Sequence, residues 1–228
     1  MGEQTGIGWT QATWNPWHGC HKIAPECKNC YMFRDKKRYG QNPTLVVRSK
    51  TKFDEPTKLA QPTVIFTCSW SDWLVEEADP WRDDAYEIIR ATPRHTYQIL
   101  TKRIDRAPGR WPGDLRNAWL GVSVGVASRK DHIDMLREQP AALKFVSLEP
   151  LLEDLGELDL REIGWGIVGG ESDYRNPRQM ELVWLENIVR QFSEQGVPLF
   201  VKQDSGWRPG QQGRIPDALF VQQMPDFG

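Results

Sequence analysis

A chain of 228 residues, 39% hydrophobic and 26% charged, can bury a substantial core and suits a single soluble domain. The formal net charge of -2 gives no global argument for nucleic acid or membrane binding, and no apolar run approaches the about 20 residues that a membrane helix needs. The first residues lack the basic and apolar regions of a secretion signal, so we expect a cytoplasmic protein with no membrane partner.

The first distinctive segment, residues 17–31 (WHGCHKIAPECKNCY), has a C-x6-C-x2-C pattern of cysteines. Three thiolates on a short loop match the ligands of an iron–sulfur cluster in which one iron lacks a protein ligand. The alternative is a zinc site closed by His18 or His21 as the fourth ligand. The segment precedes an array of strand patterns that it could cap, which favours the iron–sulfur interpretation. The candidate cluster ligands are Cys20, Cys27 and Cys30.

A helix is expected directly after Cys30, in a region rich in basic and aromatic residues. Basic side chains interleaved with aromatic ones are typical of nucleic-acid contact. A solvated helix face with a basic loop is at least as good an explanation, because the total charge is negative. The residues concerned are Phe33, Arg34, Lys36, Lys37, Arg38, Tyr39, Arg48, Lys50, Lys52 and Phe53.

Further along the chain, short β-rich apolar runs alternate with amphipathic helical patterns. Continuous apolar runs suit strands buried on both faces, and their alternation with helices predicts βαβ units and a parallel sheet. The strands are expected within 62–73, 95–103, 118–125, 143–151, 164–172 and 197–207. Helices are expected over 76–91, 128–139 and 180–195, the second opened by a capping box at Ser128, while 104–117 and 152–163 are too short or broken for full helices.

Each expected strand ends in polar residues, and Cys68, inside the first of them, is expected to be a buried thiol. In a β/α barrel the carboxyl ends of the strands form the rim that holds the active site. Strands must end somewhere and loops are polar, so one such end means nothing, but six together favour a polar pocket. These residues are Ser69, Ser71, Asp72, Thr101, Lys102, Arg103, Ser123, Ser147, Glu149, Glu171, Ser172, Lys202, Gln203 and Asp204.

Seven motifs, TWNPWHGCHKIAPECKNCY, CSWSDW, HTYQILTKR, LGVSV, FVSLEPLL, IVGGES and GVPLFVKQ, run in order from about Trp9 to Trp207. Together they resemble the phage-associated three-Cys-motif family, a domain of unknown function similar to radical SAM enzymes. The resemblance implies a TIM-barrel-like parallel β/α barrel, partial or near-complete and irregular. It also implies a [4Fe-4S] cluster on the three cysteines, with S-adenosylmethionine (SAM) on the open iron and reductive cleavage to a 5'-deoxyadenosyl radical.

Three features depart from the radical SAM pattern that the resemblance implies. The first cysteine gap holds six residues where the common spacing has three. The GGE segment that commonly contacts the SAM amino group follows an early strand, whereas residues 169–172 (GGES) follow a late one. The early position is held by SWSD (69–72), and Gly125 follows GVSV where relatives often carry an acidic residue.

The strand-end residues are assigned as follows. Lys102 and Arg103 are expected to pair with the SAM carboxylate, and Ser123 to contact the ribose. Glu149 leaves an apolar run and so needs a partner or a ligand. The full SAM-binding set is Ser69, Ser71, Asp72, Lys102, Arg103, Ser123, Glu149 and Glu171, and the substrate-binding set is Lys202 and Gln203.

One domain is expected over 1–228, with a cluster loop and basic helix in 1–60, β/α repeats in 61–207 and a tail or lid in 208–228. The expected partners are a flavodoxin- or ferredoxin-type reductant, a nucleic acid or nucleotide substrate and a protein encoded nearby. The alternative function is a nucleic-acid-binding module with zinc or an iron–sulfur cluster and no radical chemistry.

Overall fold

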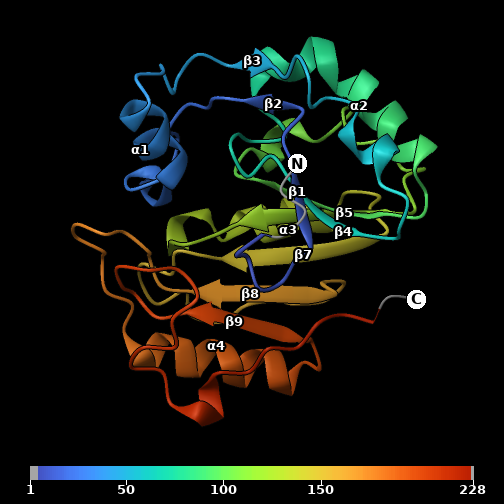
Figure 1. Ribbon diagram of the computed structural model, residues 1–228. Coiled ribbons are helices and arrows are strands. Elements are labelled where there is room, and N and C mark those ends of the chain that lie inside the picture. Colours follow the sequence, from blue (N-terminus) through green and yellow to red (C-terminus); the bar gives the residue numbers. More distant parts are fainter. Residues whose placement is uncertain (1–4, 227–228) are drawn as a thin grey trace. The chain divides into compact units, whose positions relative to one another are not determined.

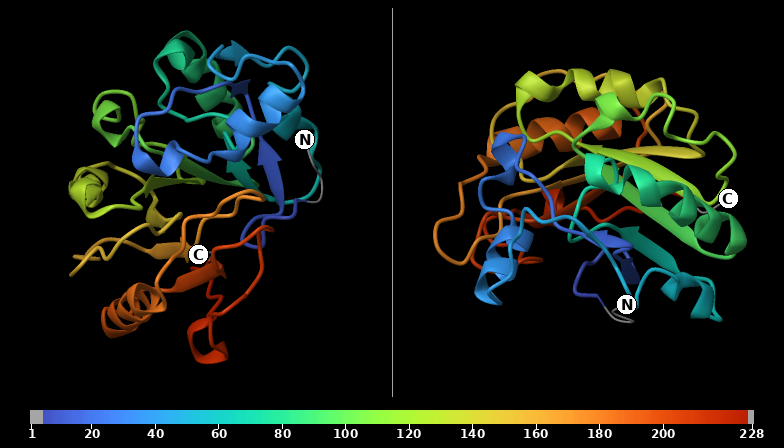
Figure 2. Two further views of the ribbon diagram at one scale, coloured as in Figure 1. Left: turned by 90° about the vertical axis from the view of Figure 1, so that its left-hand side faces the viewer. Right: turned by 90° about the horizontal axis from the view of Figure 1, so that it is seen from above.

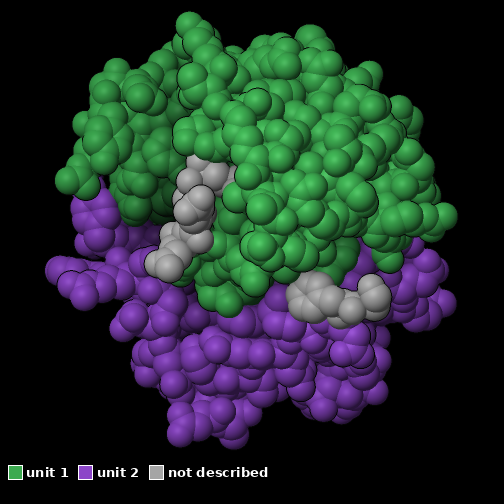
Figure 3. All heavy atoms as spheres, turned by 45° about the vertical axis from the view of Figure 1, so that its right-hand side comes forward, with its two compact units in different colours: residues 1–121, 139–142 green, residues 122–138, 143–228 purple. Residues whose placement is uncertain are grey.

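The computed structural model describes residues 5–226 and divides into two compact units, which Figure 3 colours separately. Unit 1 comprises residues 1–121 and 139–142, and unit 2 comprises residues 122–138 and 143–228. The expectation of a single domain over 1–228 stays a prediction.

Unit 1 is built on parallel strands of mostly buried residues (Figure 1). β1 (Ala12–Trp14) pairs in parallel with β4 (Val64–Thr67), and β4 pairs in parallel with β5 (Thr96–Thr101). β6 (Ala118–Ser123) follows β5 in the sheet order and continues into unit 2. Every residue of β6 is buried, which explains why its sequence is an unbroken apolar run.

The rest of unit 1 supplies two helices and a short antiparallel ribbon. α1 (Tyr31–Arg38) follows the cysteine segment, α2 (Asp79–Ala91) connects β4 to β5, and β2 (Trp17–His18) pairs with β3 (Val47–Arg48). Figures 1 and 2 show α1 and the β2–β3 ribbon on one side of the strands of this unit. Aromatic rings fill the space between them, with Trp17 and Trp73 centroids 4.8 Å apart and Trp73 and Tyr86 centroids 5.5 Å apart.

Unit 2 continues the sheet order from β6 with three parallel strands and two helices. α4 packs its apolar face with Leu185, Ile188 and Phe192 buried. Gly166 makes this packing fit, because a Cβ there would lie 2.1 Å from the ring of Phe192. The elements are α3 (Asp131–Arg137), β7 (Leu143–Leu148), β8 (Trp165–Gly169), α4 (Leu182–Glu194) and β9 (Leu199–Gln203).

The C-terminal segment of unit 2 adds to the edge of β9. The Val201 amide donates to the Val221 carbonyl at 2.7 Å, the Gln223 amide to the Leu199 carbonyl at 2.9 Å, and the pairing is antiparallel. A paired edge strand no longer offers free backbone groups for aggregation. The segment expected as a tail or lid is therefore, at residues 221–223, part of the edge of the sheet.

The six expected strands and all four expected helices are confirmed, although most are shorter than their patterns. No sequence pattern predicts β1 or the β2–β3 ribbon, because their strands are only two or three residues long. The capping box expected at Ser128 is wrong, because residues 127–129 form a 3-10 turn and α3 has no side-chain cap bond.

The fold class is confirmed as α/β with a parallel sheet, and it is a partial barrel rather than a complete TIM-like one. Among the described residues the strand order is β1-β4-β5-β6-β7-β8-β9, in which β1 and β9 are the two end strands. None of the described helices has the length and apolar character that crossing a membrane requires.

Replacing Gly166 by Ala is expected to lower the free energy of unfolding by about 2 kcal/mol, because overpacking a well-filled core displaces the Phe192 ring. Urea denaturation followed by circular dichroism measures the change. Gly206→Ala is the control, since a Cβ at Gly206 meets nothing within 4 Å. Equal stability of the two variants would contradict the packing described here.

Candidate functional site

The cysteine segment of unit 1 is fixed to two other parts of that unit through its backbone. The Gly19 amide donates to the Trp70 carbonyl at 3.0 Å, and the Cys20 amide donates to the Pro43 carbonyl at 3.0 Å. Gly19 has φ of 102°, and a Cβ there would lie 2.2 Å from the Leu45 carbonyl oxygen. Glycine is required at this position for both reasons.

The three cysteines follow one another along this segment and are free thiols. Cys27 is buried at the end of a 3-10 turn (Pro25–Cys27), and Cys30 is the residue before α1. Cys27 is near enough to Cys20 to add a small contribution to the raised pKa of the Cys20 thiol. Within residues 5–226, however, no three His, Cys, Asp or Glu side chains are gathered closely enough to hold a metal ion.

Asp72 organises the strand ends of unit 1. Its carboxylate accepts hydrogen bonds from the Leu74 amide at 2.9 Å, the Thr101 hydroxyl at 2.7 Å and the Lys102 amide at 2.8 Å. It also forms an ion pair with Arg103, with 3.1 Å between Oδ2 and Nη1. Both charged side chains are about nine-tenths buried, so each depends on the other for compensation.

Arg103 extends this network to the cysteine segment. Its Nη1 donates to Cys20 Sγ at 3.6 Å and its Nη2 to the His21 carbonyl at 3.0 Å. Burial raises the pKa of the Cys20 thiol to about 12, and the Asp72 charge adds to this effect, while Arg103 opposes it. The thiol is therefore protonated at neutral pH, and it lies 3.5 Å from the His21 carbonyl oxygen to which it donates.

The serines after β4 also bind parts of unit 1. Ser71 Oγ donates to the Gly19 carbonyl at 2.6 Å, so it holds the cysteine segment. Ser69 Oγ accepts from Asn15 Nδ2 at 3.0 Å, and its carbonyl accepts from the Tyr31 hydroxyl at 2.5 Å. Both serines were expected to contact SAM, and the structure gives them a role in positioning the segment that carries the thiols.

The two histidines beside the cysteines each use a ring nitrogen on a protein partner. His18 Nδ1 lies 2.6 Å from Lys36 Nζ, and His21 Nε2 lies 2.5 Å from Glu77 Oε1. Burial, helped by the Lys36 charge, lowers the pKa of His18. Each contact uses one ring nitrogen only, as is also usual for a histidine that ligates a metal through its other nitrogen, so the thiol-only donor set and the Cys3His zinc site both stay predictions.

In unit 2 the expected substrate residues surround Glu149, directly after β7. Glu149 Oε1 accepts from Lys202 Nζ at 2.5 Å and from Gln203 Nε2 at 3.3 Å. Gln203 also donates to the Gly170 carbonyl at 2.8 Å and accepts from the Gly210 amide at 2.9 Å. The Glu149–Lys202 pair is less than one-fifth exposed, which gives Glu149 the partner that its position demands.

Ser123, at the end of β6, is the polar residue of unit 2 that most needs a ligand. Its hydroxyl is buried and has no hydrogen-bond partner among residues 5–226. A buried polar group without a partner costs about 1 to 3 kcal/mol. A bound ligand with a hydrogen-bonding group would satisfy Ser123, and its expected contact to the SAM ribose stays a prediction.

Two arginines hold acidic residues in the loops after β8 and β9. The Glu171 carboxylate accepts from the Arg178 backbone amide and Nε, both at 2.9 Å. The Asp204 carboxylate accepts from the Arg214 amide at 2.8 Å and from Arg214 Nε and Nη2 at 2.9 Å. Burial would raise the pKa of Asp204, but the hydrogen bonds from Arg214 outweigh it and hold that pKa below its usual value.

The structure thus brings together Ser69, Ser71, Asp72, Lys102 and Arg103 within unit 1, and Glu149, Lys202 and Gln203 within unit 2. Sequence analysis did not assign the residues that hold these groups and their neighbours to their partners, because no local pattern marks such a partner, whether it lies 7 residues away, as Arg178 does from Glu171, or 56, as Glu77 does from His21. These residues are Asn15, Lys36, Glu77, Arg178 and Arg214.

Comparison with known families gives a match over nearly the whole chain. Residues 4–224 match the family described as Protein of unknown function (DUF5131). Neither the comparison with curated proteins nor that with solved structures gives a match.

Asp72→Asn is expected to lower the free energy of unfolding by about 3 kcal/mol, because it leaves the buried Arg103 charge uncompensated and turns an amide donor toward other donors. Urea denaturation at neutral pH measures it. The control is Asp84→Asn, which breaks the Arg48–Asp84 pair at an exposed site and should cost less than about 1 kcal/mol. If Asp72→Asn costs as little stability as the control Asp84→Asn, the Asp72–Arg103 pair does not support unit 1.

Arg214→Gln is expected to destabilise the protein by about 1 to 3 kcal/mol at neutral pH and by progressively less in acid. The folded-state pKa of Asp204 lies below its unfolded value of 3.8, so the stabilisation is present above that pH and is lost as pH falls through the folded pKa. Denaturation at several pH values measures this. Arg190→Gln is the matched control, with the same 48% side-chain exposure but an exposed partner, Glu194.

Proposed function

We propose that this chain, which belongs to the family described as Protein of unknown function (DUF5131), is a radical SAM enzyme. The observation that carries the proposal is the set of three free thiols on one segment that is fixed to the ends of β4 and β5. Ser71 and Arg103 make this connection, so the thiols are presented at the carboxyl ends of parallel strands. Ligand sites of parallel α/β sheets lie at these ends.

The donor set fits a [4Fe-4S] cluster with one open iron. Cys20, Cys27 and Cys30 would be the ligands, since thiolates are the ligands of such clusters and all three thiols are unpaired. As placed, the side chains are not gathered around one point, so the fit rests on the chemistry of the donors. Ligation removes the thiol proton, and the Arg103 guanidinium beside Cys20 Sγ favours the resulting negative charge.

When bound, the cluster would pass one electron from a flavodoxin- or ferredoxin-type reductant to SAM, which breaks into methionine and a 5'-deoxyadenosyl radical. The chain's own part is to position and to bind. In unit 1, Lys102 and Arg103 carry the cations proposed for the SAM carboxylate, and Arg103 is also paired with Asp72 and donates to Cys20 Sγ. Ser69, Ser71 and Asp72 hold the strand ends and the cysteine segment in place.

In unit 2, we assign Ser123 and Glu149 to SAM hydroxyls and Lys202 and Gln203 to the substrate. The unpartnered Ser123 hydroxyl supports the first assignment. Glu171 is a weaker candidate for SAM contact, because Arg178 already occupies its carboxylate. The proposed substrate is a nucleic acid or nucleotide, and a partner protein encoded nearby remains part of the proposal.

A second candidate function is nucleic-acid binding by a module whose zinc or iron–sulfur centre has no radical chemistry. The observation that favours it is the surface at the end of α1, where Lys37 and Arg38 are exposed and Tyr39 is 68% exposed. Basic and aromatic side chains together suit contact with single-stranded nucleic acid.

Anaerobically prepared protein is expected to contain about four irons per chain, and Cys27→Ser should lose this iron because it removes a ligand. Cys68→Ser is the matched control: it alters a buried thiol outside the cysteine segment and should keep the iron. Iron and sulfide analysis gives the content, and dithionite with SAM tests for 5'-deoxyadenosine.

Stoichiometric zinc without iron would refute the proposal and support the second candidate. An intact cluster in Cys27→Ser would refute the ligand assignment, and a cluster that yields no 5'-deoxyadenosine would refute the radical chemistry alone.

A further inference from the structure

Two loops of unit 2, residues 170–180 after β8 and residues 204–214 after β9, are joined into one surface feature, here called the paired loops. Ser172 and Gly206 form an isolated parallel bridge. The Asp173 amide donates to the Gly206 carbonyl at 3.0 Å, and the Met180 amide donates to Ser205 Oγ at 2.8 Å. Gly170 permits this approach, since a Cβ there would lie 2.3 Å from the Ser205 amide nitrogen.

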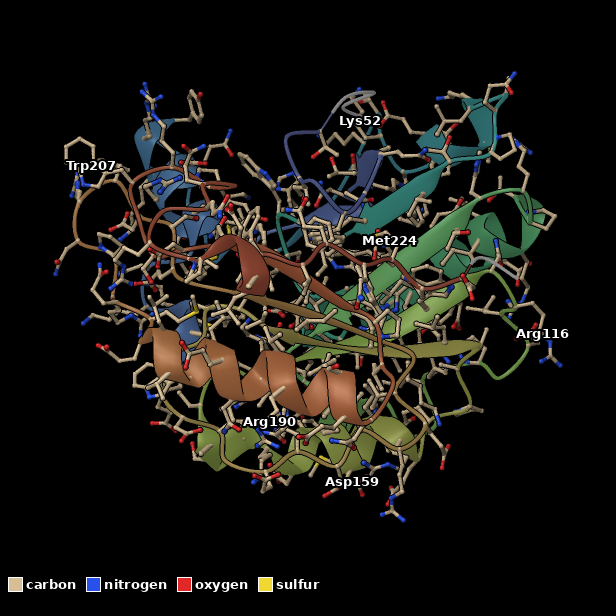
Figure 4. All side chains as sticks on the ribbon, turned by 90° about the horizontal axis from the view of Figure 1, so that it is seen from below. Lys52, Arg116, Asp159, Arg190, Trp207 and Met224 are labelled. Carbon is tan, nitrogen blue, oxygen red and sulfur yellow. The ribbon has the colours of Figure 1, made fainter. Side chains whose placement is uncertain are left out.

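The paired loops expose two aromatic side chains. Trp207 is 73% exposed and Tyr174 is 45% exposed. All 11 tryptophans lie within residues 5–226, and Trp207 alone is in the exposed class. Figure 4 shows its side chain extending from the outer side of its loop. The contacts between the two loops hold their backbones in place, so the two exposed aromatic side chains are carried by fixed backbone.

The charge that the paired loops present to solvent is positive. Their exposed charged residues are arginines: Arg175, Arg208 and Arg214. Their acidic residues are buried, with Glu171, Asp173 and Asp204 exposed by 5%, 9% and 4%. The Arg175 guanidinium lies 5.2 Å from the centre of the Tyr174 ring, so cation and aromatic ring form one contact area.

We propose that the paired loops bind single-stranded nucleic acid, with bases stacked on Trp207 and Tyr174 and with Arg175 and Arg208 against phosphates. Unpaired bases stack on exposed aromatic rings, and arginines neutralise the backbone. A protein partner is less well matched, because the other exposed uncharged residues of the paired loops are, apart from Pro209, polar or small: Asn176, Gln179, Gly210, Gln211 and Gly213. The inference rests on the proposed function only for the reaction carried out on the nucleic acid, since binding of the nucleic acid requires no cluster.

Fluorescence anisotropy with labelled single-stranded DNA and RNA of about 16 nucleotides tests the proposal on the full chain. Trp207→Ala and Tyr174→Ala should each weaken binding by about 5- to 150-fold, the range for loss of one stacked base. Trp207→Phe keeps an aromatic ring and should retain most of the affinity. Arg175→Gln with Arg208→Gln should reduce the slope of log K against log salt by about 1.4, which corresponds to two phosphate contacts.

Two controls fix the location of binding. Tyr39→Ala removes an aromatic residue of similar exposure (68%) from the basic region after α1, and Val183→Ala removes an exposed apolar residue of α4. Val183→Ala should leave the affinity unchanged, whereas Tyr39→Ala tests the rival surface at the end of α1. Equal affinity of the wild type and Trp207→Ala would overturn the proposal, as would weakening by Tyr39→Ala alone. Absence of oligonucleotide binding by the wild type would also overturn it and point to a protein partner.

Tryptophan fluorescence gives a second readout that a merely structural role would not move. Acrylamide reaches exposed indoles first, so quenching should be dominated by Trp207, and the oligonucleotide should protect it. The protection should vanish in Trp207→Phe while anisotropy still reports binding. Protein without iron should bind equally well, so that failure of the cluster proposal and failure of this one are separate results.

Discussion

The buried ion pair between Asp72 and Arg103 is the interaction on which the arrangement of unit 1 depends. Asp72 uses its carboxylate to close the turn after β4 and to bind the end of β5, and Arg103 then reaches the cysteine segment. Two charges removed from water in this way are tolerated only if each has hydrogen-bonding partners in fixed positions. The position of the Cys20 thiol is thus coupled to the packing of the strands, although 83 residues separate Cys20 from Arg103.

Unit 2 uses the same physical device at its own strand ends. Arg178 and Arg214 each bind a buried carboxylate through both side-chain and backbone donors, and both interactions connect residues of loops rather than of strands. A loop that ends a parallel strand has no ladder hydrogen bonds to fix it, so charge-assisted bonds supply the rigidity. The consequence is that Trp207 and Tyr174 are exposed on backbone that is already held in place. Stacking of a base on them would therefore carry little entropic cost for ordering the loops.

The sequence was informative where the physical cause is local. Apolar runs such as 118–125 predict buried strands because every side chain of β6 is inside, and the period of 180–195 predicts a helix because one face of α4, with Leu185, Ile188 and Phe192, is buried. It was uninformative where the cause is a distant partner. Nothing near Ser71 indicates that its hydroxyl binds Gly19, and β1 is recognised only through its pairing with β4. The strand-end residues were expected to bind SAM or substrate, which stays a prediction, and in the structure many of them bind protein groups.

This difference bears on how a ligand site should be sought among such strand ends. A polar residue whose donors and acceptors are already used, as in Glu171 with Arg178, has little left to offer a ligand. Ser123 is the opposite case, since its buried hydroxyl is unsatisfied among the described residues while the backbone beside it is bonded to Ser147. Folding has already removed water from the Ser123 hydroxyl, so a ligand that bonds to it gains a hydrogen bond without a further desolvation penalty at that group. An exposed serine would first have to give up its bonds to water. By this argument Ser123, and not the more conspicuous GGES segment, is the residue of unit 2 from which a bound cofactor or substrate is best located.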